Sequence, residues 1–182
     1  MIHRYRAVAA LAVVVALLAA CDGGDDWSPD AQFAPSLRPA FGARVTDGQL
    51  RIWTGSRCFG VTRLALTFDA DQADRAELVL TSPRGEDVEQ LTVGGPYPAL
   101  GIAEPLPEGF DWHNAESMRL SVYGRSDGWG STTNLADVVT GSQHHPADTY
   151  WFQDVGWLNA ADVAAQDGKT FLATCTPDPA EK

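Results

Sequence analysis

Three residues that lie close together in the sequence could bind a metal ion: His144, His145 and Asp148. Two imidazoles and a carboxylate are a usable set of zinc ligands. Adjacent side chains diverge in extended structure, however, and Pro146 favours an extended or turn conformation at His145. We therefore expect an exposed loop that carries two histidines, with a metal-dependent enzyme as the alternative.

A second set of polar residues, Asp69, Asp71 and Asp74, follows directly on the apolar run that ends at Phe68. Carboxylates clustered in a turn can hold calcium. The EF-hand spacing fails here, because its sixth position would be Asp74 instead of glycine and its twelfth would be leucine instead of glutamate. We expect a solvated acidic turn between two strands.

Motifs of several enzyme classes are absent from the sequence. It contains no His-Glu-x-x-His, no phosphate-cradling Gly-x-x-x-x-Gly-Lys and no Cys-x-x-Cys pair. The sequence therefore predicts no cofactor and favours a non-enzymatic binding protein, with a hydrolase or a purely structural protein as the alternatives.

The tryptophans are the strongest indication of a binding surface. Trp53, Trp151 and Trp157 lie in or beside strand-like or helix-like runs, where core packing accounts for them. Trp112 and Trp129 lie in polar, turn-rich segments instead. Aromatic rings on the loops of a β-protein suit flat contacts with sugars or peptide side chains. We predict that Trp112 and Trp129 bind a ligand, the competing interpretation being that they close the ends of the fold.

The first 21 residues indicate where the protein resides. Arg4 and Arg6 precede an unbroken apolar run over 7–20, which is too short to span a membrane. The run ends in Leu18-Ala19-Ala20-Cys21, which resembles the lipobox of bacterial lipoproteins. That resemblance implies a signal peptide over 1–20, cleavage before Cys21 and lipid on the new N-terminal cysteine. It also implies export and a membrane anchor facing the periplasm or the cell exterior.

Once Cys21 is lipidated, two cysteines remain. In an exported protein an isolated pair indicates a disulfide, here between Cys58 and Cys175. The two residues bracket nearly the whole of the expected folded region, so the bond would close a loop of more than about 100 residues.

The charge balance excludes some partners. Without Arg4 and Arg6 the chain carries 11 basic and 24 acidic side chains, a net charge of −13. Nucleic acids and anionic head groups require clustered Lys and Arg, so neither fits such an acidic surface. The expected partners are the membrane, through lipid on Cys21, and an envelope protein or glycan.

Apolar residues between the two ends alternate with a period of two, which is typical of half-buried strands. The clearest runs cover 50–53, 61–68, 76–81, 118–123 and 170–175. Turn residues at Ser82-Pro83-Arg84-Gly85 predict a hairpin that joins 76–81 to 87–93.

A single stretch favours a helix, near 159–167, with Asn159 as its cap and Gly168 as its stop. We therefore predict a mainly β protein, a single antiparallel β-sandwich (Ig-like or jelly-roll-like) with one short helix, and a β-barrel as the alternative. The expected organisation is a lipidated N-terminus and tether over 21–37, a β-rich domain over 38–176 and a tail over 177–182.

Overall fold

Two long strands organise the protein, and both come from the alternating runs of the sequence. The computed structural model describes residues 36–97, 100–125 and 128–181. Its elements are, in chain order, β1 (Pro39–Ala40), β2 (Gly42–Thr46), β3 (Gln49–Phe68), β4 (Ala76–Thr92), β5 (Gly101–Glu104), the 3-10 turn η1 (Trp112–Asn114), β6 (Ser117–Gly124), β7 (Gly128–Asn134), α1 (Leu135–Ser142), β8 (Tyr150–Phe152), β9 (Gly156–Leu158), α2 (Ala160–Gln166), β10 (Leu172–Ala173) and the 3-10 turn η2 (Pro179–Glu181).

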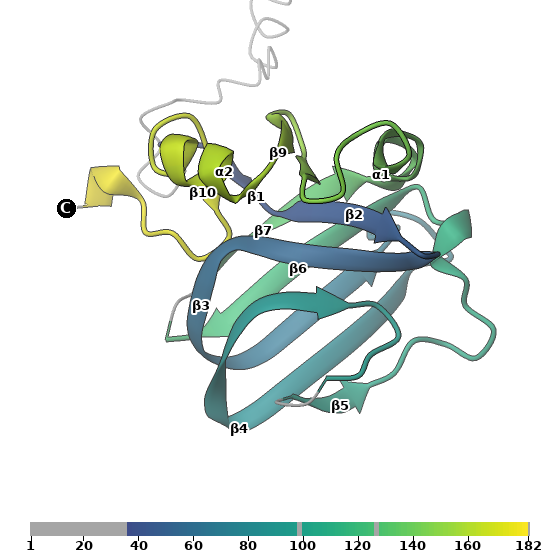
Figure 1. The fold of residues 1–182 in the computed structure, drawn as a ribbon. Helices are drawn as coiled ribbons and strands as arrows, with labels where there is room; N and C mark the ends of the chain where they lie inside the picture. The colour runs from purple at the N-terminus through teal and green to yellow at the C-terminus, as the bar shows by residue number, and fades with distance from the viewer. Residues whose placement is uncertain (1–35, 98–99, 126–127, 182) are drawn as a thin grey trace, which may run out of the picture. The chain divides into compact units, whose positions relative to one another are not determined.

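Eight of the strands form one antiparallel sheet in the order β5-β4-β3-β2-β8-β9, with β6 on β3 and β7 on β6. The strand β3 pairs with β4 along most of its length, while its other edge pairs first with β2 and then with β6. The sheet is sandwich-like and does not close into a barrel, so the predicted mainly β, antiparallel fold is confirmed. Figure 1 shows both helices on the same side of the sheet, above β2.

The core follows directly from the period-two pattern. On β3, Leu64 and Leu66 are fully buried and lie opposite Leu80 and Leu78 of β4. On the other edge Leu66 lies opposite Leu120 of β6, which is also fully buried. Each such side chain contributes about 1.5–3 kcal/mol on burial, so this three-strand ladder is a principal source of stability.

The predicted hairpin at residues 82–85 is wrong. Strand β4 continues through Pro83, and both of its parts pair with β3. The glycines produce a bulge instead of a reversal: Gly85 has a φ of 73°, and a Cβ there would lie 2.9 Å from the carbonyl oxygen of Gly60. Glycine thus allows two bulged strands to approach closely, and the chain bends without turning back.

The helix predicted near residue 160 is present as α2. Asn159 accepts hydrogen bonds from the N–H groups of Ala161 and Asp162, and the Asp162 side chain accepts from the Asn159 N–H, which completes a capping box. The sequence analysis missed the second helix, α1. Its N-terminus is capped in a similar way, because Asn134 accepts a hydrogen bond from the Asp137 N–H.

Both ends of the described chain are fastened. The Ser36 N–H donates to Asp178 Oδ2 at 2.6 Å, and the Ser36 hydroxyl donates to Oδ1. The hydrogen bond from the Ser36 hydroxyl, followed by those from the N–H groups of Ala180 and Ser36, holds the pKa of Asp178 below its usual range. The expected strand over 170–175 is reduced to β10, which pairs in parallel with β1. Ser36 and Asp178, which the expected organisation assigns to the tether and the tail, are therefore bonded to each other.

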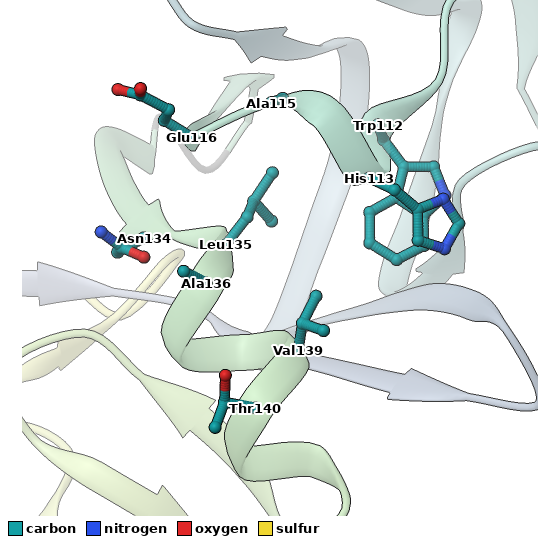
Figure 2. A pocket seen from close by; sticks show the side chains of 9 residues that line it. All are labelled: Trp112, His113, Ala115, Glu116, Asn134, Leu135, Ala136, Val139 and Thr140. Atoms are coloured by element: carbon teal, nitrogen blue, oxygen red, sulfur yellow. The ribbon is translucent and has the colours of Figure 1, made fainter.

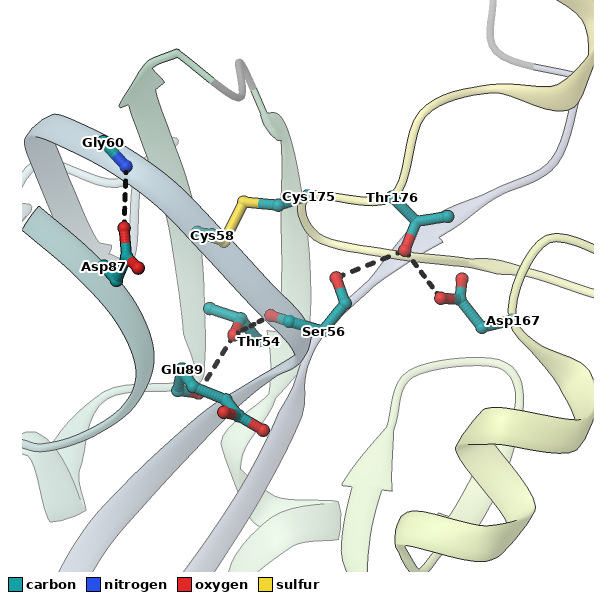
Figure 3. The surroundings of a disulfide bond; sticks show 9 residues. All are labelled: Thr54, Ser56, Cys58, Gly60, Asp87, Glu89, Asp167, Cys175 and Thr176. Carbon is teal, nitrogen blue, oxygen red and sulfur yellow. Dashed lines mark hydrogen bonds between the residues drawn. A yellow bond between two sulfur atoms is a disulfide. The ribbon is translucent and has the colours of Figure 1, made fainter.

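The predicted disulfide between Cys58 and Cys175 is confirmed, with Cα atoms 5.2 Å apart. It joins the bulged middle of β3 to the segment after β10, and hydrogen bonds surround it (Figure 3). The Thr176 hydroxyl lies 3.2 Å from Ser56 Oγ and donates to Asp167 Oδ2 at 2.6 Å. The last part of the chain is thus held to the sheet both covalently and by hydrogen bonds.

Candidate functional site

A groove runs beside Trp112, between η1 and α1. It consists of two adjoining hollows of about 520 and 380 Å³, which share Trp112, His113 and Val139 as lining residues. Figure 2 shows the larger hollow, with the stacked rings of Trp112 and His113 on one side and α1 on the other. We call this the Trp112 groove.

The Trp112 groove combines apolar and polar lining residues. Trp112 is half-buried and packs against the main core, whereas His113 is exposed. The helix contributes Leu135, Ala136 and Val139, and the polar groups at the margin are Glu116, Asn134 and Thr140. An aromatic and aliphatic floor with a few polar groups is the usual composition of a site for a small organic ligand.

The stacked pair is held in place by Asp111, the cap of η1. Asp111 Oδ1 accepts a hydrogen bond from the His113 N–H at 3.1 Å and lies 2.6 Å from His113 Nδ1. The hydrogen bond from the His113 side chain is the main cause that holds the pKa of Asp111 below its usual range. The imidazole lies nearly flat on the indole, with centroids 3.7 Å apart and planes 24° apart. These contacts present the two rings as one surface.

The two sides of the groove are tied together at one end. The Leu135 N–H at the start of α1 donates to the Glu116 carbonyl at 2.9 Å. The buried Asp69 carboxylate accepts from the N–H groups of Glu116 and Ser117, each at 2.9 Å. Asp69 therefore fixes the chain that follows η1. The sequence analysis considered this carboxylate as a calcium ligand, and the structure gives it these backbone partners instead. Asp71 and Asp74 are exposed.

The other end of α1 is fixed by Arg44, which the sequence analysis did not single out. Its side chain is buried on β2 and donates to four backbone carbonyls, those of Ser142, His145, Pro146 and Thr149. The Val45 N–H also donates to the Ser142 hydroxyl oxygen at 2.9 Å. The helix that forms one side of the groove is therefore anchored at both ends.

The structure places the three predicted metal ligands on the exposed segment after α1. His145 stacks on Trp157, with centroids 4.6 Å apart and planes 9° apart, while His144 and Asp148 are exposed. Over residues 36–97, 100–125 and 128–181, no three His, Cys, Asp or Glu side chains are grouped as a metal site would require. The local role of His145 is packing on the indole and supplying a carbonyl to the buried guanidinium of β2.

The two tryptophans predicted to bind a ligand lie at different ends of neighbouring strands. Trp112 precedes β6, whereas Trp129 is the second residue of β7. The opposite end of β7, at Asn134, is the end that lines the groove. The five residue steps from Trp129 to Asn134 span about 17 Å in a strand. The side chain of Trp129 lies outside the described part of the chain. Of the remaining tryptophans, Trp53 is buried, as core packing predicts.

A Gly-x-Ser-x-Gly spacing occurs at residues 124–128 and was overlooked in the sequence analysis. In hydrolases this motif marks a nucleophile on a sharp turn from a strand into a helix. Here the segment connects β6 to β7, which pair as antiparallel strands. That context is not a nucleophile elbow, and Ser126 itself lies outside the described residues.

The sequence analysis also missed the pairing of Asp111 with His113. The available signal was Asp-x-His at the start of a short turn, where an Asp side chain commonly accepts a hydrogen bond from the N–H two residues on. An Asp–His pair can orient an imidazole for proton transfer. The larger hollow is lined by Thr140 but by no serine or cysteine, and Ser142 in the smaller hollow donates its hydroxyl hydrogen to the Val138 carbonyl.

Comparison of the chain with models of protein families, with curated proteins and with solved structures found no match in any of the three. Neither of the helices in the described ranges has the length and apolar character needed to cross a bilayer.

Proposed function

We propose that this protein is a lipid-anchored binding module of the bacterial cell envelope, and that the Trp112 groove receives an envelope glycan. The observation that supports the site is the paired ring surface of Trp112 and His113, which faces a short helix anchored at both ends.

The composition of the groove favours an N-acetylated sugar. The flat apolar face of a pyranose ring packs against aromatic rings such as the stacked pair of Trp112 and His113, and its hydroxyl groups need hydrogen-bond partners at the margin. Glu116 and Thr140 provide such partners, while Ala136 and Val139 offer an apolar surface for an acetamido methyl group. A rigid groove also loses little conformational entropy when it binds, which benefits affinity.

The binding test compares two variants that introduce the same side chain. Ala136 is exposed and lines the groove, so Ala136→Trp should fill it without removing a core residue. Ala164→Trp makes the same change at an exposed position of α2 and serves as the control. Isothermal titration of the full chain in detergent with an N-acetylglucosamine tetrasaccharide should show binding by the wild type and by Ala164→Trp. Loss of at least about tenfold in affinity is expected for Ala136→Trp, and equal binding by all three proteins would contradict the proposal.

The anchor is supported by the sequence alone, through Arg4, Arg6, the apolar run and the lipobox ending at Cys21. Several acyl chains on one cysteine hold a protein firmly to a membrane, whereas a single chain does not. Cys21→Ala should therefore release the protein from the membrane fraction or leave its signal peptide in place. A wild-type protein that is wholly soluble, with no acyl group on its mature N-terminus, would contradict the anchor.

A further inference from the structure

The outer face of the sheet, away from the core, carries a further hollow of about 390 Å³. Its floor is made of small side chains: Ala65 of β3 lies directly opposite Ser121 of β6. Longer polar side chains stand on both sides of this floor, with Arg63 opposite Tyr123 on one side and Thr67 opposite Arg119 on the other. We call this hollow, which Arg75 and Glu77 also line, the arginine groove.

Three guanidinium groups gather there in a chain whose formal net charge is −11. Arg63 and Arg75 both pair with Glu77, the former at 3.4 Å. Arg119 donates through Nε to the Thr132 hydroxyl at 3.3 Å and forms no ion pair with a carboxylate in the described part of the chain. With Glu77 and Asp71 counted, the lining carries one excess positive charge.

Two hydroxyl groups of the groove lining are available to a ligand besides the charged groups. Thr67 is only 7% exposed yet lines the groove, and its hydroxyl has no hydrogen-bond partner among the described residues. The Thr67 oxygen is not among the fully buried side-chain atoms that lack a partner, so it is accessible from the groove. Ser121 also lines the groove. Its hydroxyl is left uncovered by Gly130 of the neighbouring strand, where a Cβ would lie 3.1 Å from Ser121 Oγ.

We propose that the arginine groove binds an acidic saccharide through a single carboxylate. The planar guanidinium of Arg119 can donate two parallel hydrogen bonds to one carboxylate. The single excess positive charge of the groove lining suits a monoanion better than the dianion of a phosphate monoester. The hydroxyls of Thr67 and Ser121 would pair with sugar hydroxyls. Tyr123 is 46% exposed and offers a ring edge beside the groove, while Arg63 lies over its face at 5.0 Å. This site is separate from the Trp112 groove and does not depend on it.

Trigalacturonic acid and its fully methyl-esterified form are a matched pair of probes, because the ester keeps the sugar backbone and replaces each carboxylate by a neutral methyl ester. Titrated into the full chain in detergent at low salt, the free acid should bind, and the ester should bind at least about tenfold more weakly. Failure of the free acid to bind at millimolar concentration, or equal binding of the ester, would overturn the proposal. Tighter binding of inorganic phosphate than of the free acid would overturn the saccharide as ligand.

Variants locate the site. Arg119→Gln should weaken binding of the free acid by about tenfold or more, and Thr67→Val, which keeps the shape of the side chain, by several-fold. Arg84→Gln removes the same charge from an exposed position outside the groove and is the control. Circular dichroism verifies that each variant is folded. If Arg84→Gln weakened binding as much as Arg119→Gln, the attraction would be non-specific and the proposed site would be wrong.

Discussion

Removal of the Cys58–Cys175 disulfide should destabilise the domain severely, because the bond closes a loop with a sequence separation of 117. In the chain-entropy model a loop of this length corresponds to about 4.9 kcal/mol at 25 °C. Domains of this size unfold with free energies of about 5–15 kcal/mol, so the loss is a large part of the total. With an unfolding entropy of about 0.3 kcal/mol per degree for roughly 150 residues, the melting temperature should fall by about 15 °C.

The assay is urea unfolding of the double variant Cys58→Ala/Cys175→Ala and of wild-type protein with and without reductant. Linear extrapolation yields the free energy of unfolding for each sample. The variant Cys21→Ala removes the third cysteine and leaves the loop closed, so its domain should unfold like the wild type. Non-reducing peptide mapping should first find Cys58 linked to Cys175.

The hydrogen bonds around the disulfide sharpen this prediction. Thr174 N–H donates to the Thr54 carbonyl at 2.9 Å, and Ala173 N–H donates to Asp167 Oδ1 at 2.8 Å. These contacts remain available after reduction, so the native fold should survive with lower stability. A change in unfolding free energy below about 1 kcal/mol would refute the loop-closure reasoning, as would two thiols that alkylate in the native, unreduced protein.

Three further predictions concern the elements that hold the Trp112 groove. Arg44→Met should destabilise the domain by about 3 kcal/mol in urea unfolding, because four backbone carbonyls lose a charged donor; an unchanged midpoint would contradict the role of this residue. Gly141→Ala should cost about 1–3 kcal/mol, since the new Cβ would collide with the indole of Trp157, and a stable variant with an unshifted indole would argue against that contact. In His113→Ala the pKa of Asp111 should rise toward its ordinary value by NMR titration, because its main hydrogen-bond donor is gone. The pKa of Asp111 is lowered in the folded wild type, so its contribution to stability is present above the unfolded pKa and is lost as pH falls through the folded pKa; an identical titration in the variant would refute the pairing.

The sequence was sufficient to predict the strands that build the core and the disulfide that closes the fold. Leu64, Leu66 and Phe68 alternate with polar or small residues, and this spacing leaves one arrangement in which the large side chains are buried. The cysteine pair was predictable because Cys58 and Cys175 are the only cysteines after Cys21. Both inferences depend on residue type and position alone.

The features missed from the sequence depend on contacts between distant segments. Residues 82–85 are typical of a turn, yet the role of Gly85 is to let β4 approach the backbone of Gly60 on β3 closely. The helix α1 follows β7 without a loop, and its valine pair at 138–139 is equally typical of a strand. Arg44 is an ordinary strand arginine in the sequence, because the carbonyls that it binds come together only in the folded chain.

The candidate site could be predicted only in part, because it too depends on contacts between distant segments. Trp112 was recognisable as a large ring in a polar segment, but the opposite side of its groove belongs to α1, more than 20 residues further along the chain. That Trp129 also binds a ligand stays a prediction, and the backbone places it and Trp112 near opposite ends of β6 and β7.

The most direct test of the central claim is to observe the indole of Trp112 while a glycan binds. In ¹⁵N-labelled full chain, the indole N–H signals of the six tryptophans can be followed during titration with an N-acetylglucosamine tetrasaccharide, with Trp112→Phe to assign the signal. The proposed function predicts that the Trp112 indole and the backbone amides of Val139 and Thr140 shift together and saturate with one dissociation constant. Unchanged signals at these three positions, at concentrations where the tetrasaccharide binds elsewhere or does not bind at all, would contradict it.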